Sequence, residues 1–111
     1  MKFMMLVCTD PSAEEYDPAL DNIEEWVTET QRLGYHLHGD RLRPPGDART
    51  VAVRGGELSV TDGPFTETIE QVAGYDMLEC PSLDVALEVA SKHPMARFGR
   101  IEVRAVWPFD E

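Results

Sequence analysis

The first strand restricts the fold most. Residues 2–8, KFMMLVC, form an apolar run in which successive side chains of an extended chain point to opposite faces. Both faces are apolar: Phe3, Met5 and Val7 on one, and Met4, Leu6 and Cys8 on the other. An outer strand of a small domain usually has one polar face, so this pattern predicts a central strand that is covered on both sides.

Helices and strands alternate along the rest of the chain. Asp17 and Pro18 are typical of a helix start and Gly34 of a helix end, which predicts a helix over 18–33. Ser82 opens a second helix, which ends at His93. Gly55-Gly56 predicts a tight hairpin. The predicted strands are 2–8, 35–43, 50–54, 57–61, 72–80 and 99–107.

This order predicts one α+β domain over residues 1–111. Two helices separated by strands in a chain of 111 residues fit a ferredoxin-like split βαβ plan, an antiparallel sheet with two helices on one face. The other face of the sheet must also be covered, because the first strand is apolar on both sides. A second copy of the sheet is the simplest cover, so we expect a homodimer, a dimeric α/β barrel.

The charge excludes some classes of partner. The chain has 10 Lys and Arg against 21 Asp and Glu, a net charge of −11. Direct nucleic-acid binding needs a basic surface and is not expected. No apolar stretch approaches the roughly 20 residues that cross a bilayer, so no membrane partner is expected, and the short apolar N-terminal run predicts a cytoplasmic protein. One basic island remains: residues 32–54 hold five Arg against two Asp.

A string at residues 61–70, TDGPFTETIE, resembles the hallmark of the DGPF-domain proteins of the YCII-related family. The family's usual pattern is DGPF followed by E-T-K-E, and this chain has Ile69 where Lys is usual. Further matching features are Gly34, Leu42-x-Pro44, Val51-x-Val53-Arg54, Gly74-Tyr75, Ser82-Leu83-x-x-Ala86, Pro94 and Ile101-Glu102-Val103-Arg104. The resemblance covers nearly the whole chain and implies a ferredoxin-like domain that dimerises sheet to sheet around a cleft.

The resemblance implies less about activity. Some YCII relatives act on small molecules, among them a dehydrochlorinase of ring-cleavage products, with a His on the first helix and an Asp near the end of the second. Those positions correspond to Ile23 and His93 here, so both members of the pair are replaced. Other DGPF domains are associated with sigma factors of the extracytoplasmic-function type, which indicates regulation.

The DGPF string has two interpretations. As a structural turn, Asp62 caps its own turn, Gly63 supplies a positive φ and Phe65 fills an apolar space. As a functional turn, it directs Asp62, Glu67 and Glu70 into the cleft, where a carboxylate in apolar surroundings could act as a general acid or base. Both interpretations stay open at the level of the sequence.

The strand over 35–43 and its surroundings supply the other candidates. A bulge at Gly39-Asp40 is expected to bring His36, His38, Arg41 and Arg43 to one face. Two His at this spacing are a weak metal signal, and we expect no metal or cofactor.

Arginine suits the recognition of an anion, and the alternative is that these arginines pair with the abundant acids. His93 ends a helix whose dipole favours the charged imidazole, and its titration near neutrality would suit proton transfer.

These residues lead to two hypotheses, which leave open whether the protein is an enzyme. In the first, a small, anionic metabolite binds in a cleft and undergoes acid–base chemistry. Asp62, Glu67 and His93 are the candidate proton-handling groups, and the candidate ligand-binding residues are His38, Arg41, Arg54, Phe65 and Glu70. In the second, the chain is a non-catalytic ligand-binding or regulatory module linked to transcription.

Overall fold

A computed structural model describes residues 1–64 and 71–111 and shows an α+β fold. Its main sheet is antiparallel, with the strand order β2-β5-β1-β6. The strands of this sheet are β1 (Lys2–Cys8), β2 (His36–Arg41), β5 (Val72–Glu79) and β6 (Arg100–Ala105). The sequence-based α+β prediction with an antiparallel sheet is therefore confirmed, and β1 is a central strand as expected.

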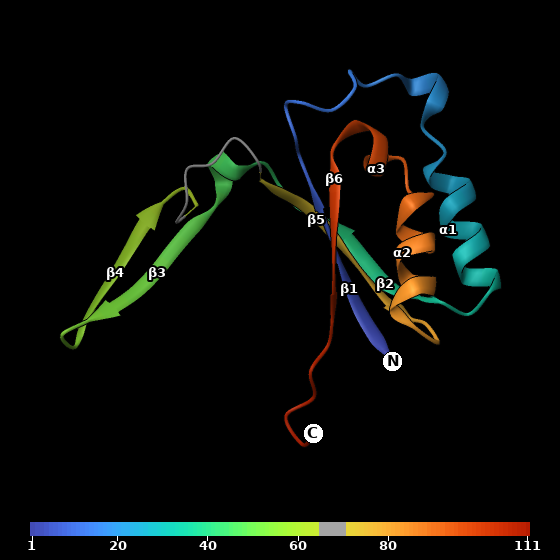
Figure 1. The fold of residues 1–111 in the computed structure, drawn as a ribbon. Helices are drawn as coiled ribbons and strands as arrows, with labels where there is room; N and C mark the ends of the chain where they lie inside the picture. The colour runs from blue at the N-terminus through green and yellow to red at the C-terminus, as the bar shows by residue number, and fades with distance from the viewer. Residues whose placement is uncertain (65–70) are drawn as a thin grey trace.

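Two helices, α1 (Ile23–Arg32) and α2 (Leu83–Ser91), lie on the same face of this sheet (Figure 1). A short helix, α3 (Met95–Phe98), follows α2, and two 3-10 turns span Pro18–Leu20 and Pro45–Asp47. Among the described residues, no helix has the length and apolar character needed to cross a membrane.

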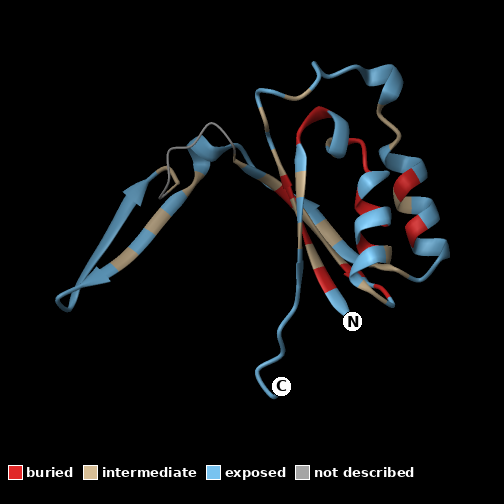
Figure 2. Cartoon of the chain, in the orientation of Figure 1, coloured by how far each residue is buried: buried red, intermediate tan, exposed pale blue. Residues whose placement is uncertain are grey.

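The core lies between the sheet and these two helices. Figure 2 shows the buried residues on the strands and helices that face one another. The largest contributors, Phe3, Met5 and Leu78 from the sheet and Trp26 from α1, are each at most 3% exposed. Small residues of α2, including Ala86 and Ala90, let that helix approach the sheet closely. One face of β1 therefore supplies the centre of the core.

The first helix begins later than predicted. Asp17 does act as a cap, since its carboxylate accepts from the Ala19 N–H, but the turn that it starts ends at Leu20. Asp21 has an extended backbone and its side chain accepts from the Ile23 N–H at 3.1 Å, which opens α1 at a second site. Two aspartates that compete for backbone N–H groups thus divide the predicted helix.

Replacement of Ser82 by alanine tests the start of α2. The Ser82 hydroxyl accepts from the Val85 N–H at 3.2 Å, and its loss is expected to lower the free energy of unfolding by about 1 kcal/mol. Urea denaturation followed by circular dichroism measures the change. Ser91→Ala is the matched control, because that exposed hydroxyl caps no helix start. Equal effects of the two substitutions would contradict the capping role.

The predicted bulge in β2 lies elsewhere. The register shifts between His36 and His38, so that His36 pairs with Leu78 and His38 with Met77. Leu78 and Met77 point to opposite faces, and the two His side chains do the same. The expectation that His36 and His38 share a face is therefore wrong, because the extra residue is Leu37 rather than Gly39.

The predicted hairpin forms a separate two-stranded sheet of β3 (Arg49–Arg54) and β4 (Glu57–Asp62). Its turn is Gly55-Gly56, with φ of +57° and +81°, a region that glycine enters without strain. Figure 1 shows this hairpin extending away from the main sheet. We call residues 49–62 the arm.

Candidate acid–base site

A cavity of about 450 Å³ lies beside the C-terminal end of β2 and the N-terminal half of β5, next to the end of α2. Its polar lining includes one carboxylate flanked by two imidazoles. The residues that line it are Val7, Ile23, Val27, His36, Gly39, Asp40, Arg41, Ala73, Gly74, Tyr75, Asp76, His93 and Met95.

Asp76 is the centre of this site. It lies on β5 opposite Met5, so its carboxylate points toward the helices. His36 Nε2 lies 2.9 Å from one carboxylate oxygen and His93 Nε2 lies 3.9 Å from the other. The side chains of His36, Asp76 and His93 are only 9%, 15% and 6% exposed. Three residues far apart in the chain thus form one largely buried polar cluster.

Gly39 makes room for the Asp76 carboxylate. The two residues are paired across β2 and β5. A Cβ at position 39 would lie 2.1 Å from Asp76 Oδ1 and 2.6 Å from the Tyr75 carbonyl oxygen. A side chain at this position would therefore displace Asp76 or the strand, and the glycine serves the site rather than the bulge that the sequence suggested.

Trp26 holds both imidazoles from the α1 side. Its ring meets the His36 and His93 rings edge to face, with centroids 5.7 Å and 4.8 Å away. The indole N–H donates to the Val89 carbonyl at 2.8 Å, which fixes the ring between α1 and α2. The two imidazoles are therefore positioned by packing as well as by Asp76.

Burial lowers the pKa of His93 below its ordinary 6.5, and the carboxylates of Asp76 and Asp21 oppose that change in part. Desolvation thus opposes the charged form that the helix dipole was expected to favour. His93 Nδ1 accepts from the Met95 N–H at 3.0 Å, so the proton of the neutral ring sits on Nε2, which faces Asp76. At neutral pH the ring is an uncharged hydrogen-bond donor.

This lowered pKa predicts acid sensitivity. Between the folded-state pKa of His93 and 6.5, the unfolded chain binds more protons than the folded chain, so the free energy of unfolding falls as the pH falls below 6.5. His93→Gln is expected to lose less stability than the wild type between pH 7.5 and 5.5, measured by urea denaturation. His38→Gln, on the other face of the sheet, is the control. Equal pH dependence in wild type and His93→Gln would contradict the assignment.

The structure brings together only some of the residues that the sequence suggested. His93 and Arg41 line the cavity, whereas His38 lies on the opposite face with its ring 5.9 Å from that of Tyr75. Asp62 lies at the base of the arm, 90% exposed, and pairs with Arg49 at 3.1 Å. Arg54 lies at the tip of the arm and donates to the Val53 carbonyl.

The remaining candidates Phe65, Glu67 and Glu70 lie outside the described residues. Within the DGPF string, Gly63 has a φ of +87°, as the structural-turn interpretation requires. The alternative that arginines pair with acids is confirmed for Arg43, which binds Asp47 at 2.7 Å, and for Arg49.

Sequence reasoning did not identify Asp76. A signal was present, since Asp76 is the one charged residue inside the strand VAGYDML, between apolar neighbours. A carboxylate in such a strand is costly to bury unless it is paired. The pairing partners, however, are 40 and 17 residues away, and only the folded chain shows them.

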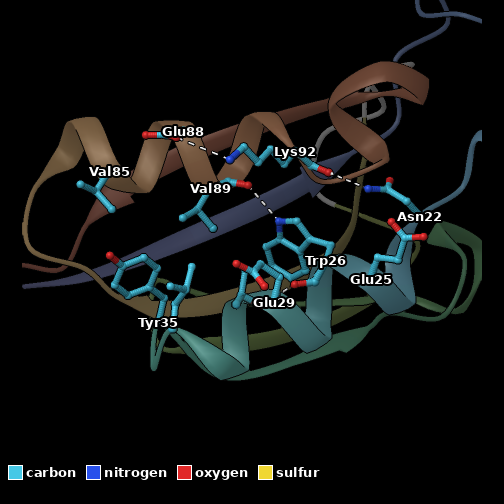
Figure 3. A pocket seen from close by; sticks show the side chains of 11 residues that line it. Asn22, Glu25, Trp26, Glu29, Tyr35, Val85, Glu88, Val89 and Lys92 are labelled. Atoms are coloured by element: carbon cyan, nitrogen blue, oxygen red, sulfur yellow. Dashed lines mark hydrogen bonds and ion pairs between the residues drawn. The ribbon is translucent and has the colours of Figure 1, made fainter.

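A second hollow, a groove of about 380 Å³, runs between α1 and α2 (Figure 3). Trp26 forms part of its lining and separates it from the His36 and His93 rings. Lys92 pairs with Glu88 at 3.5 Å, and the Asn22 amide donates to the Lys92 carbonyl at 3.4 Å. These polar groups satisfy one another on an exposed surface, so the groove offers less for chemistry than the cavity around Asp76.

Comparison with known proteins indicates the family of the chain. An uncharacterised protein of Rhizobium meliloti (strain 1021) is 48% identical over 50 residues, which is 45% of this chain. That match spans only 40% of the relative's own length. The model of the YCII-related domain matches residues 1–110. The chain belongs to the YCII-related family.

Proposed function

We propose that the cavity around Asp76 binds a small anionic molecule and moves a proton to or from it. The observation that supports this proposal is the single buried carboxylate shared by two imidazoles, His36 at 2.9 Å and His93 at 3.9 Å. Buried clusters of titratable groups beside a cavity are typical of acid–base sites.

The proposed roles follow from the hydrogen-bond geometry. With a carboxylate oxygen of Asp76 as the acceptor, His36 Nε2 is the hydrogen-bond donor, which leaves Nδ1 to act on the bound molecule. Such an imidazole is a general base whose tautomer is fixed by the acid beside it. His93 keeps its proton on Nε2 and donates a hydrogen bond to negative charge that develops on the bound molecule.

Arg41 is the proposed anchor for the anion. It lines the cavity and forms no ion pair within residues 1–64 and 71–111. A guanidinium suits a carboxylate or phosphate, and here it would attract an anion into a chain of net charge −11. Ile23 and His93, the positions to which the resemblance assigns the relatives' His and Asp, both line this cavity, which supports the proposed location of the site.

NMR titration of the three histidines tests the proposal. Small carboxylates and phosphorylated metabolites are added one at a time, and the Cε1–H signals are followed. At least one anion is expected to shift the His36 and His93 signals and leave His38 unchanged. Arg41→Gln should weaken that binding at least about tenfold, since one charge-assisted hydrogen bond contributes roughly 1.5–3 kcal/mol. The absence of any responding anion would overturn the proposal.

Proton transfer is tested separately from binding. A responding compound is incubated in D₂O, and deuterium incorporation at carbon is measured. His36→Gln, which removes the proposed base, is expected to slow that exchange roughly 10²–10⁴-fold, the usual contribution of a positioned acid or base. Binding without exchange would instead support the second hypothesis, a ligand-binding regulatory module.

The same proposal includes a homodimer. The strand order β2-β5-β1-β6 is that of a ferredoxin-like split βαβ plan. The sheet face opposite the helices carries four half-buried apolar side chains at its centre, namely Met4, Leu6, Tyr75 and Met77. We call this surface the open face. A second copy packed on it would form the dimeric α/β barrel, with a mass of twice 12.5 kDa.

A further inference from the structure

The arm has one apolar face that nothing in the described chain covers. Val51 pairs with Val60 and Val53 with Leu58 across the hairpin, so all four side chains share a face. Their exposed fractions are 65%, 58%, 58% and 67%. The opposite face consists of small and polar residues, Thr50, Ala52, Arg54, Glu57, Ser59 and Thr61. At the base of the arm this apolar face ends in the Arg49–Asp62 ion pair. Exposed apolar surface rimmed by polar groups is typical of an interaction site.

An isolated two-stranded ribbon is marginally stable in water. The arm is anchored at its base, where the Gly63 N–H donates to the Ala48 carbonyl and the Thr50 hydroxyl to the Gly63 carbonyl. Beyond that base, no other helix or strand of residues 1–64 and 71–111 lies beside it (Figure 1). The radius of gyration is 16.2 Å, whereas a compact domain of this length has about 13 Å. The chain is therefore more extended than one self-contained globule.

We propose that the apolar face of the arm packs on a second copy of this chain and completes the homodimer proposed above, on which this inference rests. Four strands of about six residues give an open face of roughly 400 Å². A stable interface needs about 800 Å² on each partner. One arm has roughly 200 Å² of strand surface. Each copy buries its own arm and also the area that the partner's arm covers, which adds roughly 400 Å² to its interface. The arms thus supply the area that the open face lacks.

Charge also favours a second copy as the occupant. The arm carries Arg49 and Arg54 against Glu57 and Asp62, so its own charges balance. The rest of the chain holds the whole excess of acid that gives a net charge of −11. A balanced arm can approach an acidic copy with less repulsion than the acidic segments of the chain would meet. Reciprocal exchange of arms also closes the assembly, because each apolar face is covered once.

Analytical ultracentrifugation of the full chain and three lysine variants tests the inference. Leu58→Lys places a charge on the apolar face of the arm, and Ser59→Lys, its neighbour on the same strand, places one on the polar face. Met77→Lys alters the open face. Leu58→Lys is expected to raise the dimer dissociation constant at least about tenfold, because an unpaired charge is costly in an apolar contact, and Ser59→Lys should leave it within about twofold.

The outcomes separate the two proposals. If Met77→Lys dissociates the dimer but Leu58→Lys acts no more strongly than Ser59→Lys, the arm inference fails and the sheet-to-sheet dimer stands. If only Leu58→Lys dissociates it, the open faces are not in contact, and both the sheet-to-sheet dimer and the arm's proposed part in completing it fail. A wild-type monomer at all concentrations overturns both.

Hydrogen exchange of the wild type needs no substitution. The arm amides should be protected above the dimer dissociation constant and exchange rapidly below it. Equal exchange at both concentrations would overturn the inference.

Discussion

Gly39→Ala is expected to disrupt the proposed acid–base site and lower stability together. The added methyl group would lie 2.1 Å from Asp76 Oδ1 and 2.6 Å from the Tyr75 carbonyl oxygen, so either the carboxylate or the β2–β5 pairing must move. Overpacking of this kind costs roughly 1–3 kcal/mol of the free energy of unfolding. The His36–Asp76 hydrogen bond of 2.9 Å is expected to be lost, since its acceptor is displaced.

Two measurements follow this substitution. Urea denaturation gives the stability, and proton NMR gives the downfield imidazole N–H signal of His36, which a hydrogen bond to a carboxylate protects from exchange. Gly46→Ala is the matched control, because a Cβ there meets no atom within 4 Å. It should change stability by less than about 0.5 kcal/mol. A Gly39→Ala protein with the His36 signal intact would show that Asp76 does not depend on the glycine.

Trp26→Ala is expected to have the largest effect on stability. Trp26 is 3% exposed, contacts both site imidazoles and donates to the Val89 carbonyl at 2.8 Å. Removal of a buried tryptophan costs about 3–5 kcal/mol through lost transfer energy and the cavity that remains. That is a large part of the roughly 5–15 kcal/mol that stabilises a typical domain. Urea denaturation at fixed protein concentration, followed by circular dichroism, measures the loss.

The other tryptophan of the chain is the control. Trp107 is 83% exposed beyond the end of β6, and Trp107→Ala is expected to change stability by less than about 0.5 kcal/mol. In Trp26→Ala, the His36 and His93 signals should also broaden or shift, because their packing partner is gone. A Trp26→Ala protein as stable as Trp107→Ala would show that the α1 side of the core does not depend on this residue.

Much of the fold could be predicted from local patterns. The apolar run of β1, the Gly55-Gly56 turn and the Ser82 cap each act within a few residues, so the sequence predicts them directly. The start of α1 was predicted wrongly. Asp17 and Asp21 each accept a hydrogen bond from a backbone N–H two residues later, and the sequence does not indicate which of the two precedes the α-helix. In α1, Trp26 and Thr30 are buried, whereas Ile23 and Leu33 are 37% and 44% exposed.

The candidate site was predicted only in part. His93 and Arg41 were identified as residue types suited to proton transfer and anion binding, and both line the cavity. His36 was assigned to the same face as His38, and the position of the bulge reversed that assignment. Asp62 attracted attention because it belongs to a recognisable string, yet it pairs with Arg49 on the exposed arm. The DGPF string is easy to recognise in the sequence, but that gave no information on whether Asp62 lies near the cavity.

The sequence by itself determined the element order, the central place of β1 and the hairpin at Gly55-Gly56, because periodicity and turn chemistry are local properties of the chain. Only the tertiary structure decided which polar groups meet. Asp76, His36 and His93 come together because β5 lies between β2 and β1, and because α2 ends over the same strands. The energy of such a cluster depends on burial and on distances between residues remote in the chain, and no local pattern records either.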